Sequence, residues 1–144
     1  MSEQENIKAA NSFFEAWNSG NLRMAEPYEA EDFRQEVAPG APGPMTMEQN
    51  RAYNQNFLNA FPGSKFKVLL TVAQGDYVVT NWTITGMHTG PLQSPSGAVI
   101  PPTGKSSTVT GSTTYRVRNG KIVRAWVYFD MAGLLGQLGL LPPM

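Results

Sequence analysis

The sequence predicts an α+β fold, in which helices in the first half of the chain precede an antiparallel sheet in the second half. Apolar residues recur at helical spacing up to residue 63, and from there the period of the pattern changes from 3.6 to 2. Asn119-Gly120 then separates two long alternating segments, as expected of a two-residue β-hairpin turn. From the length of 144 residues we expect one domain spanning residues 1–144.

Capping boxes mark the starts of two predicted helices. Ser2-x-x-Glu5 and Thr46-x-x-Gln49 each place a side-chain acceptor before an apolar run, where it can bind free backbone N–H groups. Helices are therefore expected over residues 2–20, from about residue 22 until a proline at 27 distorts or ends it, and over residues 46–61.

The second half of the chain has the alternation of β-strands. Strands are expected over residues 65–72, 77–88, 105–118 and 121–129, followed by a short helix over residues 131–138. In the first of these strands, Phe66, Val68, Leu70 and Val72 are expected on one face. Residues 89–104 contain four prolines and three glycines and predict a long loop, a kind of segment that often serves function. Its apolar residues Leu92, Val99 and Ile100 could form a lid.

The Asn119-Gly120 turn predicts which side chains share a face of the sheet. It pairs Arg118 with Lys121 and, by counting back, Tyr115 with Arg124. One face then carries Thr113, Tyr115, Arg124, Trp126, Tyr128 and Asp130, a mixture of aromatic and polar groups that suits a ligand cavity. The other carries Thr114, Arg116, Val123, Ala125, Val127 and Phe129 and suits a subunit interface. We therefore expect a homodimer formed through the outer face.

The composition excludes several classes of function. The 11 Lys and Arg residues balance the 11 Asp and Glu residues, so nucleic acid and anionic membranes are not expected as partners. The chain has no cysteine and one histidine, His88, so neither a cysteine-ligated zinc site nor a multi-histidine metal site is expected. No secretory signal or membrane span is visible, and we expect a cytoplasmic protein.

Several stretches match a known family. They are FFEAWNSGNL at 13–22, LNAFPGSKFKV at 58–68, VVTNWTITGMHTG at 78–90 and, most specifically, residues 101–141, which contain PTGK, NGKI, W-x-x-x-D and QLG in that order. They resemble the SnoaL-like polyketide cyclase (ester cyclase) branch of the NTF2-like superfamily. The resemblance implies a cone in which a strongly curved antiparallel sheet wraps around N-terminal helices and encloses a deep pocket.

The resemblance also implies a catalytic base. Family cyclases use a pocket aspartate near the end of the last long strand, which matches Asp130. A carboxylate among aromatic side chains is desolvated, which raises its pKa and strengthens it as a base. The alternative is that Asp130 caps the helix that follows it. Glu36 occupies the place where relatives often carry a histidine. It could pair with an arginine or be a second pocket carboxylate, and the alternative is a solvated loop residue.

Other side chains are candidates for contact with a substrate. His88 ends a strand at the edge of the long loop, where it could act as an acid or merely bind the backbone. A phenol such as Tyr115 or Tyr128 could stabilise an enolate oxygen by donating a hydrogen bond. The expected substrate-binding residues are Trp17, Glu36, Tyr53, Phe57, Trp82, Tyr115, Trp126 and Tyr128.

We therefore expect a cofactor-free cyclase or isomerase that acts on a hydrophobic, carbonyl-bearing, polyketide-like molecule. In this hypothesis, Asp130 removes a proton beside a carbonyl, and Tyr115, Tyr128 or His88 stabilises the enolate. The alternatives are a non-catalytic small-molecule-binding protein and a cofactor-independent hydroxylase. No metal or other cofactor is expected in any of these cases.

Overall fold

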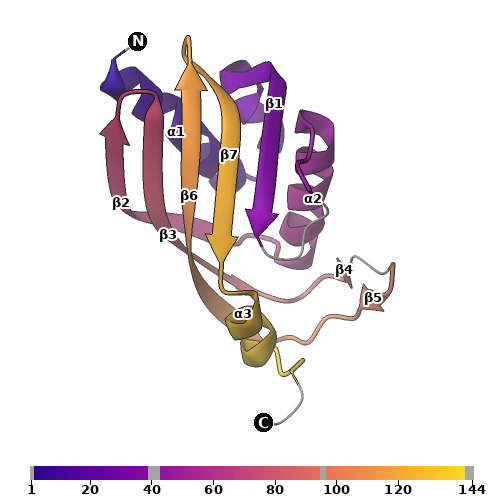
Figure 1. Cartoon of the computed structure of the whole chain (residues 1–144). Coiled ribbons are helices and arrows are strands. Elements are labelled where there is room, and N and C mark those ends of the chain that lie inside the picture. Colours follow the sequence, from indigo (N-terminus) through magenta and orange to yellow (C-terminus); the bar gives the residue numbers. More distant parts are fainter. Residues whose placement is uncertain (1, 39–42, 95–96, 142–144) are drawn as a thin grey trace.

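The computed structural model describes residues 2–38, 43–94 and 97–141 (Figure 1). The elements in chain order are α1 (Glu3–Asn18), the 3-10 helix η1 (Leu22–Tyr28), β1 (Glu29–Ala38), α2 (Met47–Ala60), β2 (Lys65–Gln74), β3 (Tyr77–Met87), β4 (Leu92–Gln93), β5 (Val99–Ile100), β6 (Ser106–Arg118), β7 (Lys121–Phe129) and α3 (Met131–Gln137). Among these, no helix is long and apolar enough to cross a membrane.

A curved five-stranded sheet, in the order β1-β7-β6-β3-β2, carries α1 and α2 on one face (Figure 1). The predicted α+β class is confirmed, but the sheet is mixed rather than wholly antiparallel, because β1 runs parallel to β7. The strand β1 was not predicted from the sequence. Its inward positions include the polar Gln35, and a register irregularity between Glu29 and Arg34 interrupts the alternation.

The predicted helix starts are confirmed by their hydrogen bonds. The Ser2 hydroxyl accepts the backbone N–H of Glu5 at 3.1 Å. At the start of α2, the Thr46 hydroxyl accepts the N–H of Gln49 at 3.2 Å, and the Gln49 side chain accepts the N–H of Thr46 at 3.0 Å. Pro27 lies inside η1, which is a 3-10 turn and not a regular α-helix.

A β-bulge at Val123 overturns the predicted face assignment of β7. Val117 pairs with Ile122, but Arg116 pairs with Arg124, so β7 contains one extra residue. Because side chains alternate along a strand, this insertion exchanges the two faces of everything after it. The face of Tyr115 is therefore shared by Ala125, Val127 and Phe129, whereas Arg124, Trp126 and Tyr128 point to the other side of the sheet. The apolar set expected at a subunit interface thus faces the helices.

A second bulge has the same effect in β2. Val68 pairs with Trp82 and Leu70 with Asn81, so Leu69 is an extra residue. Phe66 and Val68 pack in the core, as expected, but Leu70 and Val72 turn to the outer face, where each is 53% exposed. The single apolar face predicted for residues 66–72 is therefore wrong.

The segment 89–104 is partly ordered as a small hairpin of β4 and β5. Leu92 is buried with Phe61, Leu134 and Leu138, so this side chain belongs to a core cluster beside α3. Val99 is exposed. The prediction of an irregular loop is therefore correct only in part, and its residues 95 and 96 lie outside the described residues.

Phe66 and Trp82 join α1 to the sheet. The ring centroid of Phe66 lies 5.2 Å from those of Phe14 and Trp17 and 5.0 Å from that of Trp82. The indole of Trp82 lies across Gly111, its partner on β6, which allows the ring to approach the backbone closely. A Cβ atom at Gly111 would lie 2.4 Å from Cη2 of Trp82 and 2.8 Å from the carbonyl oxygen of Tyr128.

Gly111→Ala should therefore destabilise the fold, by about 1–3 kcal/mol, because the added methyl group must displace the Trp82 indole or the β7 backbone. The measurement is the free energy of unfolding in urea. Gly136→Ala is the matched control, since its new Cβ would lie 3.6 Å from the nearest atom, on Leu141, and alanine favours the helix. Equal stability of Gly111→Ala and wild type would contradict the proposed role of this contact.

Candidate ligand-binding cavity

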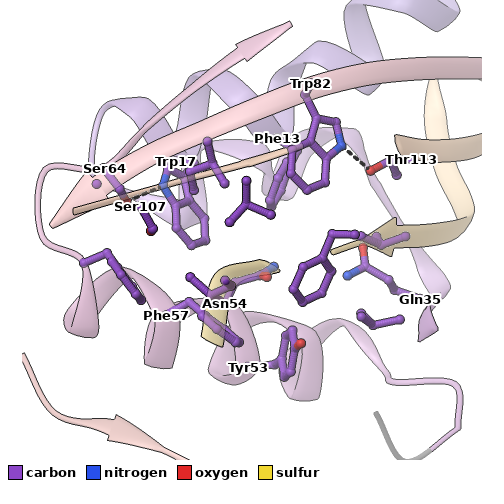
Figure 2. A pocket seen from close by; sticks show the side chains of 18 of the residues that line it. Phe13, Trp17, Gln35, Tyr53, Asn54, Phe57, Ser64, Trp82, Ser107 and Thr113 are labelled. Carbon is purple, nitrogen blue, oxygen red and sulfur yellow. Dashed lines mark hydrogen bonds between the residues drawn. The ribbon is translucent and has the colours of Figure 1, made fainter. Parts of the chain in front are cut away.

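A cavity of about 110 Å³ lies between α2 and the inner face of the sheet (Figure 2). An engineered protein cavity of about 150 Å³ holds benzene, so this cavity is of the size of a single small ring. Its apolar lining consists of Phe13, Trp17, Val37, Phe57, Phe61, Trp82, Ile84, Gly86, Val109, Val127, Phe129 and Leu134. The lining residues come from α1, α2, α3, the connection between α2 and β2, and all of the large sheet's strands except β2.

The polar part of the lining is uncharged. It consists of Gln35, Tyr53, Asn54, Ser64, Ser107, Thr113 and Tyr115. Among the residues that the structure describes, no Asp, Glu, Lys, Arg or His side chain lines the cavity. A charged ligand would lose its hydration here without an ion pair in return, which is costly. The arrangement therefore favours neutral, largely apolar molecules that carry hydrogen-bonding groups.

Two indole–hydroxyl hydrogen bonds hold polar groups at the cavity wall (Figure 2). Nε1 of Trp17 donates to Oγ of Ser64 at 3.1 Å, and Nε1 of Trp82 donates to Oγ1 of Thr113 at 2.9 Å. All four side chains are buried. A buried indole N–H needs an acceptor, and here each hydroxyl meets that need while remaining part of the lining.

The two phenols of the lining stay protonated near neutral pH. Burial raises the pKa of Tyr115, an effect that a hydrogen bond to Thr113 opposes only in part. Burial also raises the pKa of Tyr53. Both groups can therefore donate a hydrogen bond to a ligand, and neither is suited to act as a phenolate base.

Polar contacts fix α2 over the cavity. Nε2 of Gln35 on β1 donates to Oδ1 of Asn50 on α2 at 2.6 Å, and both side chains are buried. Further along α2, Asn56 makes two hydrogen bonds with the backbone of Gln93, at 3.0 and 3.1 Å. These contacts tie α2 to β1 on one side and to β4 on the other.

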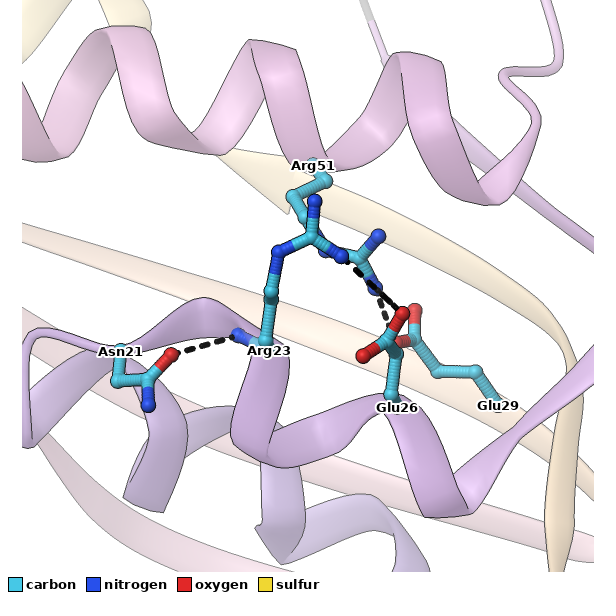
Figure 3. A network of polar contacts seen from close by, with 5 residues as sticks. All are labelled: Asn21, Arg23, Glu26, Glu29 and Arg51. Carbon is cyan, nitrogen blue, oxygen red and sulfur yellow. Dashed lines mark hydrogen bonds and ion pairs between the residues drawn. The ribbon is translucent and has the colours of Figure 1, made fainter.

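An ionic network adds a third attachment for α2 (Figure 3). The guanidinium group of Arg51 lies 3.3 Å from Glu29 and 3.7 Å from Glu26, which in turn lies 3.3 Å from Arg23. Burial raises the pKa of Glu29, and the charge of Arg51 partly opposes this rise. The network therefore connects η1, β1 and α2, and Asn21 caps η1 by accepting the N–H of Arg23 at 3.2 Å.

The structure brings together five of the predicted substrate-binding residues. Trp17 of α1, Tyr53 and Phe57 of α2, Trp82 of β3 and Tyr115 of β6 all line the cavity. They come from elements far apart in sequence, and Figure 2 shows Trp17, Tyr53, Phe57 and Trp82 around one space.

Asp130, the predicted base, does not line the cavity. Its Oδ1 accepts the N–H of Gly133 at 2.8 Å, so Asp130 is the N-cap of α3, and its side chain is exposed. It borders a shallow hollow on the outer side of the sheet, beside Leu70 and Tyr128. The bulge at Val123 explains this position, because it turns the predicted aromatic and polar face of β7 away from the helices.

Glu36, Trp126 and Tyr128 also lie outside the cavity lining. Glu36 belongs to β1 and pairs with Arg124 at 3.1 Å, while the guanidinium of Arg124 lies 5.6 Å from the centre of the Trp126 ring. Tyr128 is 54% exposed. These residues form a charged and aromatic cluster on the outer face of the sheet. Of the alternatives for Glu36, the pairing with an arginine is confirmed, and Glu36 is neither a pocket carboxylate nor a loop residue.

His88 is a structural residue of the segment after β3. Its ring is fully buried, stacks on Phe61 with 5.1 Å between centroids, and accepts the N–H of Thr103 on Nδ1 at 3.2 Å. Its backbone bonds to Gly104 and Lys105, each at 2.9 Å. Burial lowers the pKa of His88, although the Gly90 backbone opposes this effect. The ring lies behind Phe61 and does not line the cavity.

Several small polar residues of the lining were not predicted from the sequence. Gln35, Asn54, Ser64 and Ser107 carry no motif that marks them. The available signal was a polar residue at an inward position, as with Ser107 and Thr113, which alternate with outward residues along β6. Within the described ranges, no three His, Asp or Glu side chains gather as a metal site would require.

Comparison of the sequence with known protein families shows the family to which the chain belongs. A sequence model of the family described as SnoaL-like polyketide cyclase matches residues 7–138. IdmH of Streptomyces antibioticus, a candidate polyketide cyclase, is 30% identical with a TM-score of 0.77, over 93% of this chain and 98% of IdmH. The chain belongs to the SnoaL-like polyketide cyclase family and has its NTF2-like fold.

More distant solved structures share this fold. AclR of Streptomyces galilaeus, a candidate hydroxylase, is 24% identical with a TM-score of 0.84, over 99% of this chain and 90% of AclR. A candidate SnoaL-like polyketide cyclase from Jannaschia sp. CCS1 is 21% identical with a TM-score of 0.83, over 98% of this chain and 95% of that chain. No curated protein is a significant match.

The lowered pKa of His88 predicts a stability that falls as the pH is lowered. The unfolded chain binds a proton near pH 6.5, whereas the folded chain resists it, so stability is complete above pH 6.5 and is lost below it. One such proton changes the free energy of unfolding by at most about 1.4 kcal/mol per pH unit. Urea unfolding between pH 7.5 and 5.5 measures this slope.

His88→Gln is the variant that isolates the effect, because His88 is the only histidine of the chain. Its slope over the same pH range should be smaller than that of wild type, whatever its absolute stability. Glu29, whose raised pKa stabilises the fold toward low pH, acts in the opposite sense in both proteins. An unchanged slope in His88→Gln would disprove the assignment.

Proposed function

We propose that this chain binds an uncharged, carbonyl-bearing, polyketide-like molecule in the cavity and promotes closure of a ring without a cofactor. The observation that carries the proposal is the lining, which is apolar apart from hydroxyl, phenol and amide groups. Membership of the SnoaL-like polyketide cyclase family supports the reaction class. The cavity's size suits the part of the molecule that becomes the ring.

The lining supports catalysis by positioning and by hydrogen bonding. Holding two ends of a chain in reacting geometry can contribute about 7–11 kcal/mol to lowering a barrier. Donors aimed at a carbonyl oxygen stabilise the negative charge that develops there when carbon attacks. Ser64, Thr113, Tyr115 and Asn54 are donors of this kind in the described lining.

A strong base is not required for such a substrate. In a β-dicarbonyl compound the carbon between the two carbonyls enolises readily, so a nucleophilic carbon is present without an enzymic carboxylate. In an aldol closure this carbon bonds to a second carbonyl carbon, the displaced proton ends on the new hydroxyl, and water leaves on dehydration. This proposal replaces proton removal by Asp130, because that carboxylate caps α3 outside the cavity.

The test substrate is methyl 3,7-dioxooctanoate, which closes to a cyclohexenone ester with loss of water. The wild-type protein should accelerate closure over buffer, and Asp130→Asn should leave the rate unchanged, because asparagine is an equally good helix cap. A general base would instead lose about 10²–10⁴-fold in rate. Product formation by chromatography measures both rates.

Val127→Phe is the companion variant, since its larger ring would occupy the cavity from β7. Closure should fall to the rate in buffer while the fold is retained. Acceleration that survives in Val127→Phe would place the reaction elsewhere on the molecule. Loss of activity in Asp130→Asn would show that a rearranged Asp130 is the base, against the mechanism proposed here.

A further inference from the structure

The two indole–hydroxyl pairs have a consequence for what the cavity can recognise. Ser64 and Thr113 are 2% and 3% exposed, and each accepts an indole N–H while lining the cavity. A hydroxyl group has one hydrogen to donate, and accepting from the indole leaves that hydrogen unused. Because the indole is a donor only, neither pair can take a donor from the ligand at the indole nitrogen.

The hydrogen of Ser64 has no acceptor among the described residues. Tyr115 lies two positions from Thr113 on β6, and both side chains line the cavity, so their hydroxyl groups are neighbours. One hydrogen bond between these two hydroxyls uses one of their two hydrogens, so one remains whichever group donates. Each pair therefore presents one unsatisfied donor to the cavity, and a buried donor without an acceptor costs free energy.

The two donors lie at different ends of the cavity (Figure 2). The first end, Trp17–Ser64, is next to Gly86 and the second, Trp82–Thr113, is next to Gly111. Between the two ends, Ile84 lies two positions from both Trp82 and Gly86 on β3 and lines the cavity. The β3 wall between the two ends is therefore apolar.

We infer that Ser64 and Thr113 are specificity-determining residues that together select a dicarbonyl chain, with one carbonyl oxygen accepting a hydrogen bond at each end of the cavity. This inference rests on the proposed function, since it assigns the substrate's oxygens to places in the same cavity. It adds that a molecule with one carbonyl group uses only one end at a time.

The test compares heptane-2,6-dione and nonane-2,8-dione with heptan-2-one. Affinity is measured from the three indole N–H signals of ¹⁵N-labelled protein, of which Trp17 and Trp82 report on the cavity and Trp126 on the outer face. Ser64→Ala removes the hydroxyl donor of the first end. Thr113→Val combined with Tyr115→Phe removes the hydroxyl donors of the second end, because either change alone leaves one hydrogen. Each deletion also frees an indole N–H, of Trp17 or Trp82, and the indole signal of the variant shows whether that N–H binds the ligand in its place.

Each donor deletion should weaken binding of at least one dione by about 2- to 12-fold, the range for one net hydrogen bond, and the two effects should multiply. The affinity for heptan-2-one should fall only about two-fold with either deletion, since this ligand can bind at the other end. Its affinity should fall by the whole factor of about 2- to 12-fold when both donors are absent.

The matched controls are Thr80→Val and Ser12→Ala. Thr80 is buried opposite Thr113 on β3, and Ser12 is buried in α1, and neither lines the cavity. These controls should bind all three ligands as wild type does. The indole spectrum and urea unfolding of each variant establish that it is folded.

The outcomes separate the two proposals. If no ligand moves the Trp17 or Trp82 signals of the wild-type protein, cavity binding itself is overturned. If the ligands bind but the donor deletions weaken diones and the monoketone equally, or no more than the controls do, the dicarbonyl inference fails while the proposed function stands. The inference is supported if both donor deletions weaken binding of a dione and neither weakens binding of heptan-2-one to the same extent.

Discussion

The extra residue at Val123 sets the orientation of the strand that forms the cavity floor. Because the bulge shifts the pairing of β7 with β6 by one position, Ala125, Val127 and Phe129 face the helices. The same shift sends Arg124 to the outer face, where it pairs with Glu36. Without the bulge, a guanidinium group and two large aromatic side chains would fill the space between sheet and helices. The apolar, uncharged cavity therefore depends on one irregularity of backbone pairing.

An uncharged cavity restricts the chemistry that the site can perform. Tyr53 and Tyr115 are kept protonated by burial, and Asp130 is committed to capping α3. What remains is a set of hydrogen-bond donors held in place by buried partners, including two indoles. Such groups hold and polarise carbonyl oxygens but do not remove protons from unactivated carbon. The site is thus suited to substrates that bring their own reactivity, which is a property of β-dicarbonyl chains.

The sequence predicted the features that depend on local interactions. Capping by Ser2 and Thr46 involves residues three positions apart, and the hairpin at Asn119 uses a positive φ of 53° that asparagine tolerates. The bulges at Leu69 and Val123 could not be predicted, because they respond to the twist of the assembled sheet and leave no composition signal. Because the bulge at Val123 was not predicted, Trp126 and Tyr128 were assigned to the wrong face of the sheet. The inward positions Thr113 and Tyr115 on β6, which contains no extra residue, were predicted correctly.

The two hydroxyl ends of the cavity also bear on how turnover ends. A dicarbonyl chain that closes by aldol condensation and then loses water gives up one carbonyl oxygen, since that carbon becomes part of the ring's double bond. Where the lost oxygen is one of the two that the cavity bound, the product can satisfy Ser64 or the Thr113 pair, but not both. Its affinity should be lower than that of the open chain by the value of one hydrogen bond. Under the proposed function, ring closure would in this way weaken binding of the product and limit product inhibition.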